Sequence, residues 1–167
     1  MMTAPQIVTA YMEQTRQDLI KSYHEKGLKA SGKYEKGLTY HVEDSGTKIR
    51  AYMESEGHAW FMEKGRGRNK KRTEKELIGF ALWALDEDKP GGGFIKKWLR
   101  DKGLVADNPF GIAYRIGAQG INVPNPFNVG NVIRDVVTNE WFDGLVSQLA
   151  DHFILVTVTE VERLFRK

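Results

Sequence analysis

The residues best suited to chemistry form a run of cations near the middle of the chain: Lys64, Arg66, Arg68, Lys70, Lys71, Arg72 and Lys75. A flexible cationic segment can contact several phosphates of a nucleic acid without reading its sequence. It can equally pair with acidic patches on a neighbouring subunit and become ordered there. A solvated loop that only aids solubility is the third interpretation, and charge alone does not decide among the three. No aromatic residue interleaves with the cations, which argues against stacking on single strands.

A near-match to a phosphate-binding loop lies earlier in the chain. Residues 27–33 fit the pattern G-x-x-x-x-G-K, but Tyr34 stands where serine or threonine would hold magnesium. The pattern also follows a predicted helix and leads into a predicted hairpin, whereas a phosphate-binding loop joins a strand to a helix. We therefore interpret residues 27–33 as a turn.

The histidines and the acidic cluster form no recognisable catalytic or metal-binding pattern. The histidines are scattered, at His24, His41, His58 and His152. Residues 86–88 are all acidic but lack the alternating oxygen ligands of a calcium loop. There is no cysteine for a thiolate site, and no nucleophile elbow or glycosidase-like carboxylate pair. We therefore predict that the protein is not an enzyme and uses no cofactor and no metal ion.

The composition is that of an ordinary globular protein. Of 167 residues, 41% are apolar and 28% charged, which predicts a single folded domain over residues 1–167. The net charge of +3 is mild, so it does not by itself indicate a nucleic-acid-binding protein. The start does not resemble a signal peptide, and the longest apolar run, residues 153–156, is too short to cross a bilayer. We expect a soluble protein made in the cytoplasm.

The first half of the chain predicts a long helix followed by a hairpin. Thr3 and Gln6 form a capping box, and Gly27 is a natural end, so we expect a helix over roughly residues 4–26. Its apolar stripe consists of Ile7, Val8, Tyr11, Met12, Leu19, Ile20 and Tyr23. Alternating apolar and polar residues at 38–43 and 48–53 predict a β-hairpin with one buried face. Residues 60–62 return to the core, and residues 65–72 are an exposed loop.

The second half predicts several helices. Residues 73–85 begin with a capping box and are apolar nearly all round, so we expect this helix to be deeply buried or at a subunit contact. Short helices are predicted at 94–102 and 108–117, and an extended loop at 118–130. Residues 132–137 can form a third strand or a helical turn. The spacing from Trp141 to Leu164 favours one long helix, although β-branched residues at its centre favour a strand.

The predicted fold class is therefore α+β, with a long N-terminal helix, a small antiparallel sheet built on a β-hairpin, several short helices and a long C-terminal helix. Within it, short motifs lie at residues 31–34, 58–67, 94–99, 113–117 and 124–127. Their order resembles the family of bacteriophage tail-component or tail-completion proteins, also called minor tail, neck or head–tail joining proteins. The resemblance covers roughly residues 5–165, and the long basic insertion after Glu63 departs from the shortest family members.

The resemblance implies a virion structural protein, made in the host bacterial cytoplasm, that assembles as a ring at the neck. Such a ring joins or completes the tail and lines the DNA passage, with other neck, connector or tail proteins and double-stranded DNA as partners and no membrane. The expected contacts to a partner or the DNA channel are Lys64, Arg66, Arg68, Lys70, Lys71 and Arg72. The expected subunit-interface residues are Trp60, Trp83, Pro124, Pro126 and Phe127. The alternative is a small non-enzymatic nucleic-acid-binding protein that uses the basic loop at 64–75.

Overall fold

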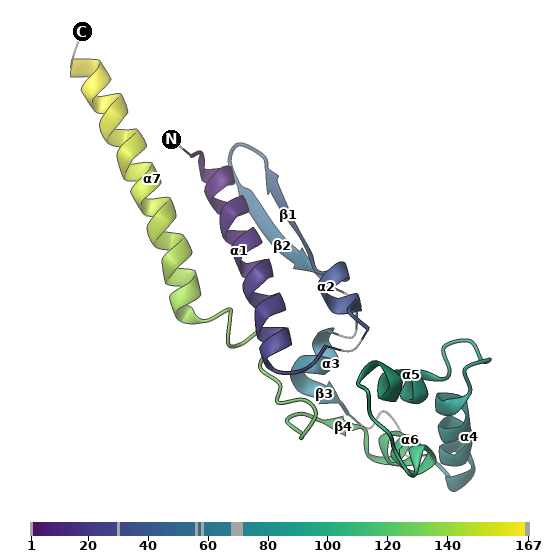
Figure 1. Cartoon of the computed structure of the whole chain (residues 1–167). Helices are drawn as coiled ribbons and strands as arrows, with labels where there is room; N and C mark the ends of the chain where they lie inside the picture. Colours follow the sequence, from purple (N-terminus) through teal and green to yellow (C-terminus); the bar gives the residue numbers. More distant parts are fainter. Residues whose placement is uncertain (1, 30, 56, 58, 68–71, 166–167) are drawn as a thin grey trace.

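The computed structural model describes residues 2–29, 31–55, 57, 59–67 and 72–165. Within them lie two long helices, five shorter ones and two small antiparallel sheets, which confirms the predicted α+β class. The molecule is elongated, with α7 at one end, α4, α5 and α6 at the other, and α1 with the β-hairpin between them (Figure 1). Among the helices of the described residues, none has the length and apolar character needed to cross a membrane.

The N-terminal helix α1 spans Ala4–Glu25, as its capping signals predict. The Thr3 amide donates a hydrogen bond of 2.8 Å to the Gln6 side chain. At the other end Gly27 adopts a φ of +63°, and the amides of residues 27 and 28 bond back to the last turn of the helix. The buried face consists of Ala4, Val8, Met12, Thr15, Leu19, Ser22 and Tyr23. The helix thus offers one continuous side to the rest of the protein.

The predicted hairpin is present and packs on α1. Strand β1 (Thr39–Asp44) pairs antiparallel with β2 (Ile49–Glu54), with Val42 opposite Ala51. Two short helices, α2 (Lys33–Gly37) and α3 (Ala59–Lys64), flank the hairpin in the chain. The buried residues that these elements share, here called the α1 core, are Leu19, Tyr23, Tyr34, Leu38, Ala59 and Val132. The near-match to a phosphate-binding loop leads into the short helix α2, so the prediction that it leads directly into the hairpin is wrong. It still follows a helix, α1, whereas a phosphate-binding loop follows a strand.

Residues 132–137 form helical turns and not a third strand. The Val137 amide bonds to the Ile133 carbonyl at 2.8 Å, and the Asp135 amide bonds to the Asn131 carbonyl at 3.2 Å. The segment is β-branched, but Val132 enters the α1 core and is only 1% exposed. Burial of the Val132 side chain does not require hydrogen bonds to a neighbouring strand, so the β-branched residues do not force a strand here. Of the two predicted alternatives, the helical turn is confirmed.

A second buried cluster, here called the α4–α6 bundle, lies at the far end of the molecule. It is built from α4 (Glu74–Leu85), α5 (Phe94–Asp101) and α6 (Pro109–Gln119). Its buried residues are Ala81, Ala84, Ile95, Leu99 and Ala113. The three alanines are 0% exposed, because small side chains at the crossing of α4 and α6 let the two helices approach closely.

A two-residue sheet joins the chain entering the α4–α6 bundle to the chain leaving it. Strand β3 (Gly65–Arg66) pairs antiparallel with β4 (Ile121–Asn122). The predicted exposed loop at 65–72 is therefore wrong at its first two residues, and Gly65 is buried. Two residues are too few to show the alternating pattern of a strand. Their partner strand also lies far along the chain, so no local signal marks the pairing.

Gly65→Ala is expected to destabilise the protein by about 2 kcal/mol or more. Gly65 has a φ of +75°, and a Cβ atom there would collide with the Ile121 carbonyl oxygen. The free energy of unfolding from urea titration measures the loss. Gly46→Ala is the matched control, because Gly46 also has a positive φ (+80°) but open space around it. Equal losses in the two variants would show that close packing at β3 contributes nothing.

Burial of Tyr34 predicts a loss of stability in alkali. Tyr34 is 2% exposed and lies against Tyr23, with ring centres 4.7 Å apart. Burial disfavours the phenolate and, with smaller contributions from Tyr23 and Glu63, raises the pKa of Tyr34 from 10.0 to about 12. The folded chain keeps a proton that the unfolded chain releases above pH 10. Stability from this group is therefore complete below that pH and is lost as the pH rises towards 12.

The expected loss amounts to roughly 2–3 kcal/mol of unfolding free energy. Tyr34→Phe keeps the ring but has no proton to release, so its stability should fall less over the same pH range. The comparison is made by urea titration of both proteins at a series of pH values. Parallel curves for the two proteins would mean that other groups cause the alkaline loss.

Candidate assembly surfaces

Lys64 and Trp60 form a cation–π pair on the exposed side of α3. The Lys64 Nζ lies 4.3 Å from the centre of the Trp60 ring, one helical turn away. Such a pair contributes about 0.5–1 kcal/mol at an exposed site. The Trp60 side chain is still 57% exposed, so it can contact a partner as predicted. Of the other predicted basic contacts, Arg66 lies in β3, and Arg68, Lys70 and Lys71 lie outside the described residues.

Arg72 makes contacts inside its own chain. Its guanidinium carbon lies 4.7 Å from the centre of the Phe80 ring on α4. Its Nη1 donates a hydrogen bond of 3.1 Å to the Gly117 carbonyl on α6. Arg72 therefore links the N-terminal end of α4 to α6, a role that the sequence analysis did not predict.

The loop after β4 carries three of the predicted interface residues, Pro124, Pro126 and Phe127, all of them exposed. The Phe127 ring meets the edge of Trp98 on α5, with centres 5.7 Å apart, and stays 59% exposed. The Asn128 side chain donates a hydrogen bond of 2.9 Å to the Met62 carbonyl on α3. The loop is thus held against α5 and α3, and Pro124, Pro126 and Phe127 stay exposed.

The outer side of α4 is an exposed apolar surface. Ile78 is 40% exposed, Leu82 58% and Trp83 38%. The Trp83 Nε1 donates a hydrogen bond of 3.2 Å to the Pro90 carbonyl, which fixes the indole on this side. A shallow hollow beside these residues is lined in part by Leu82 and Trp83, with Lys89 and Lys96 among its lining residues. Because α4 is apolar nearly all round, its apolar residues are partly buried in the bundle and partly exposed on the outer side. A helix at a subunit contact, one of the two predicted alternatives, would have such an exposed side.

Helix α7 (Asn139–Phe165) exposes the longest series of large apolar side chains among the described residues. The exposed ones are Phe142, Val146, Phe153, Ile154, Leu155, Val156, Val158 and Val161. Of these residues, the sequence analysis used Phe153 and Val161 in the helical repeat, and it included none of the eight in the predicted interface. The signal was present, because residues 153–156 are consecutive apolar residues, which no single buried helix face can cover.

The first turns of α7 are held by α1. The Trp141 Nε1 donates a hydrogen bond of 2.8 Å to the Thr15 hydroxyl on α1. The Tyr11 hydroxyl in turn donates one of 2.7 Å to the Trp141 carbonyl, and the two rings meet edge to face. Beyond this anchor, the C-terminal half of α7 runs past the N-terminal end of α1 (Figure 1).

Comparison with known proteins adds no relative. No protein-family model, no curated protein and no solved structure matches this chain. The resemblance to phage tail-completion proteins therefore stays a prediction. The functional argument depends on the surfaces described above.

Two histidines of the described chain each lie beside a carboxylate. His24 lies 3.2 Å from Glu35, and His41 lies 3.4 Å from Glu54. Among the described residues, no group of three or more histidine, aspartate or glutamate side chains could hold a metal ion.

Charge is distributed unevenly between α7 and the rest of the chain. Residues 139–165 contain five carboxylates and one arginine, a net charge of −4. Because the whole chain carries +3, the remaining residues carry +7. Helix α7 is therefore acidic, whereas the rest of the chain is basic.

Proposed function

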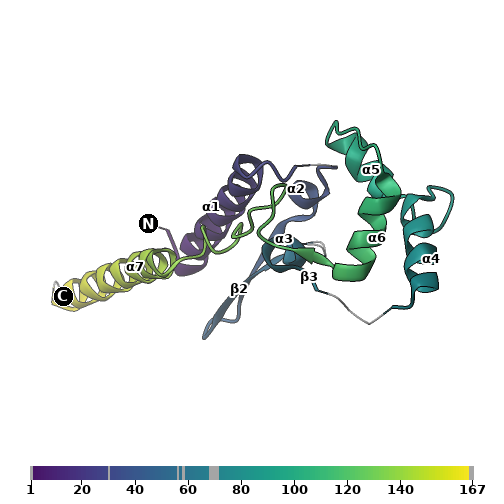
Figure 2. The same cartoon turned by 90° about the horizontal axis from the view of Figure 1, so that it is seen from below.

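We propose that the protein is a structural component of a bacteriophage virion that assembles as a ring at the neck. In this proposal the ring joins or completes the tail and lines the DNA passage, and its partners are other neck, connector or tail proteins. The observation that supports assembly most strongly is the pair of exposed apolar surfaces, α7 and the outer side of α4, at opposite ends of one chain (Figure 2). The phage context comes from the resemblance in sequence.

Two different surfaces at opposite ends favour head-to-tail association. A contact between unlike patches repeats from one copy to the next, and it closes into a ring when the rotation between copies allows. Isolated apolar surfaces of this extent are uncommon on monomers and mark interaction sites. The basic segment around Lys64 would then face DNA in the channel or an acidic patch of a neighbour.

The ring is tested by light-scattering mass over a concentration series, with negative-stain images of the same fractions. Closed particles with a central hole, at a fixed multiple of the 19.0 kDa chain, are the expected result. The connector of the phage is added in a parallel series, because a ring of this kind can need a template. A monomer both alone and with the connector would refute the proposal.

A small nucleic-acid-binding protein is the second candidate, favoured by the cations at 64–75. Replacing Arg66, Arg68 and Lys71 by serine distinguishes the nucleic-acid-binding protein from the ring. Arg72 is kept, because it donates a hydrogen bond to α6. For the binding protein, duplex affinity falls and the salt slope drops by about 3. For a ring in which these cations contact an acidic patch of a neighbour, assembly weakens while the monomers stay folded. The matched control removes three exposed lysines elsewhere, Lys33, Lys36 and Lys48.

A further inference from the structure

We propose that the α4–α6 bundle is a hinged unit, which swings about the β3–β4 ribbon and is held closed by Lys102. In the closed position, which is the one described above, Lys102 at the end of α5 contacts the end of α1. The hinge goes beyond the proposed ring and does not depend on it. Three observations support it: the two buried clusters are separate, glycines flank the ribbon between them, and the ends of α1 and α5 meet through one lysine.

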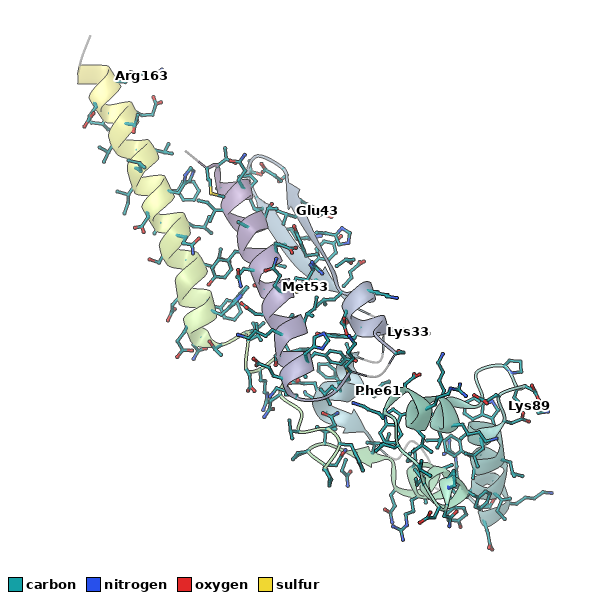
Figure 3. The ribbon with its side chains drawn as sticks, viewed as in Figure 1. Lys33, Glu43, Met53, Phe61, Lys89 and Arg163 are labelled. Carbon is teal, nitrogen blue, oxygen red and sulfur yellow. The ribbon has the colours of Figure 1, made fainter. Side chains whose placement is uncertain are left out.

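The α1 core and the α4–α6 bundle bury separate sets of side chains. Among the described residues, the hydrophobic side chains packed in or against the α1 core lie in residues 19–62 and 132–136. Those of the bundle lie in residues 80–116. Figure 3 shows the two groups of side chains approaching each other near Phe61 on α3. Movement of the bundle as a rigid body therefore leaves both hydrophobic cores intact.

The chain crosses between the two clusters at the β3–β4 ribbon, and a glycine flanks the ribbon at each crossing. Gly67 directly follows β3, and a Cβ atom there would lie in open space. Gly120 lies between α6 and β4, with a φ of +78° and a ψ of −160°, a conformation essentially restricted to glycine. A hinge consists of a few residues at the ends of elements, where the backbone dihedral angles can change without disturbing a packed core.

Lys102 and Trp98 hold the bundle against the rest of the chain. The Lys102 Nζ donates a hydrogen bond to the Gly27 carbonyl, just beyond the end of α1. The Trp98 ring meets Phe127 edge to face, and Phe127 stays 59% exposed. Neither contact is part of a buried cluster core, so a small free-energy difference separates the closed position from an open one.

Lys102 lies between the C-terminal ends of two helices. Helix α1 ends at Glu25, two residues before Gly27, and α5 ends at Asp101, directly before Lys102. The C-terminal end of a helix carries about half a negative charge, so two such ends repel each other. The ammonium group of Lys102 attracts both ends. Loss of its charge would therefore remove a hydrogen bond and leave the repulsion uncompensated.

Closure also has a cost, which keeps it reversible. Burial lowers the pKa of Lys102, because the closed position takes its ammonium group partly out of water. This desolvation offsets part of the attraction to the helix ends. When the bundle opens, the exposed side of α4 moves with it, whereas α7 stays anchored on α1 through Trp141. The two exposed apolar surfaces thus take more than one relative direction within a single chain.

Distances between labels on the two units test the hinge. The chain has no cysteine, so Ala10→Cys on α1 and Lys75→Cys on α4, both at exposed positions, supply two unique sites for nitroxide labels. Double electron–electron resonance then gives the distribution of distances between the labels. Dilution with unlabelled chain ensures that these distances lie within one copy. With no further substitution, one main distance and a minor second population are expected.

Lys102→Met removes the cation and keeps a side chain of similar length. It should increase the second population about tenfold or more, as expected for loss of a hydrogen bond from a charged group. Adding Phe127→Ala, which removes the ring against Trp98, should increase it further. Lys97→Met is the matched control, because Lys97 carries the same charge on the same helix and is exposed. Its distribution should match that of the unsubstituted chain.

An unchanged single distance in Lys102→Met and in the double variant would show that other contacts fix the bundle, and would overturn the inference. So would a distribution that is equally broad with and without Lys102, or an equal effect of Lys97→Met. Hydrogen exchange resolved by segment checks that residues 74–119 stay protected in each variant. Loss of that protection would also overturn the inference, because Lys102 and Phe127 would then stabilise the fold of the bundle and not its position.

Discussion

Gly117→Leu is expected to unfold the α4–α6 bundle while the α1 core stays folded. A Cβ atom on Gly117 would lie 2.6 Å from the Phe80 ring and 3.4 Å from a methyl group of Leu77. Neither neighbour can yield easily, because Leu77 is buried and Phe80 is held by Arg72 and by the ring of Trp83. Overpacking usually costs 1–3 kcal/mol, and a leucine at a helix crossing closed by fully buried alanines should cost about 3 kcal/mol or more.

Hydrogen exchange resolved by segment measures this effect. Protection should fall in residues 74–119 and persist in α1 and the hairpin. Gly79→Leu is the matched control, since Gly79 lies on α4 with open space around it and leucine favours the helix. If Gly117→Leu instead lowers protection throughout the chain, the two clusters unfold together as one cooperative unit and the prediction is wrong.

The helices could be predicted because their ends are encoded locally. Thr73 and Glu76 bond to each other at the start of α4, and the Asn108 side chain accepts a 2.7 Å hydrogen bond from the Gly111 amide at the start of α6. Each cap involves residues three apart, so adjacent sequence contains the whole interaction. The hairpin was predictable for the same reason, since the Gly46 amide bonds to Asp44 within the turn itself.

Elements defined by distant partners were beyond local reasoning. Gly65 belongs to β3 only because residues 121–122 return beside it. Val132 is buried because it meets the α1 core, and Ser22, 110 residues earlier, donates a hydrogen bond to its carbonyl. β-branched residues favour strands on average, but here tertiary packing determined the conformation.

The same limit applies to the candidate surfaces. Sequence indicated that α4 has more apolar residues than one buried face needs, and the structure places Leu82 and Trp83 at the surface. Sequence could not show that Arg72 turns inward to Gly117, because that hydrogen bond spans 45 residues. It also missed α7 as a surface, since a helical repeat predicts a buried face but not whether the protein supplies anything to bury it.

Trp141→Ala is expected to release α7 from α1. Trp141 is the anchor of the helix: its indole donates a hydrogen bond to Thr15 and packs on the ring of Tyr11. Its backbone carbonyl accepts a 2.7 Å hydrogen bond from the Tyr11 hydroxyl. Removing a large, partly buried aromatic ring costs about 3 kcal/mol, of which the hydrogen bond supplies about 1 kcal/mol. Amides of residues 139–150 should then exchange about a hundredfold faster, because about 3 kcal/mol corresponds to roughly two factors of ten.

Comparing Trp141→Ala with Trp141→Phe and Val146→Ala separates the contribution of the Trp141 anchor from that of the exposed face of α7. Trp141→Phe keeps the aromatic packing and loses only the hydrogen bond, so its exchange should lie between wild type and Trp141→Ala. Val146→Ala changes a side chain that is 64% exposed and should leave exchange in the monomer unaltered. Because a released α7 no longer has a fixed direction, Trp141→Ala should also weaken assembly although every apolar side chain of the exposed face remains. Unchanged exchange in Trp141→Ala would show that α7 is held by contacts other than this anchor.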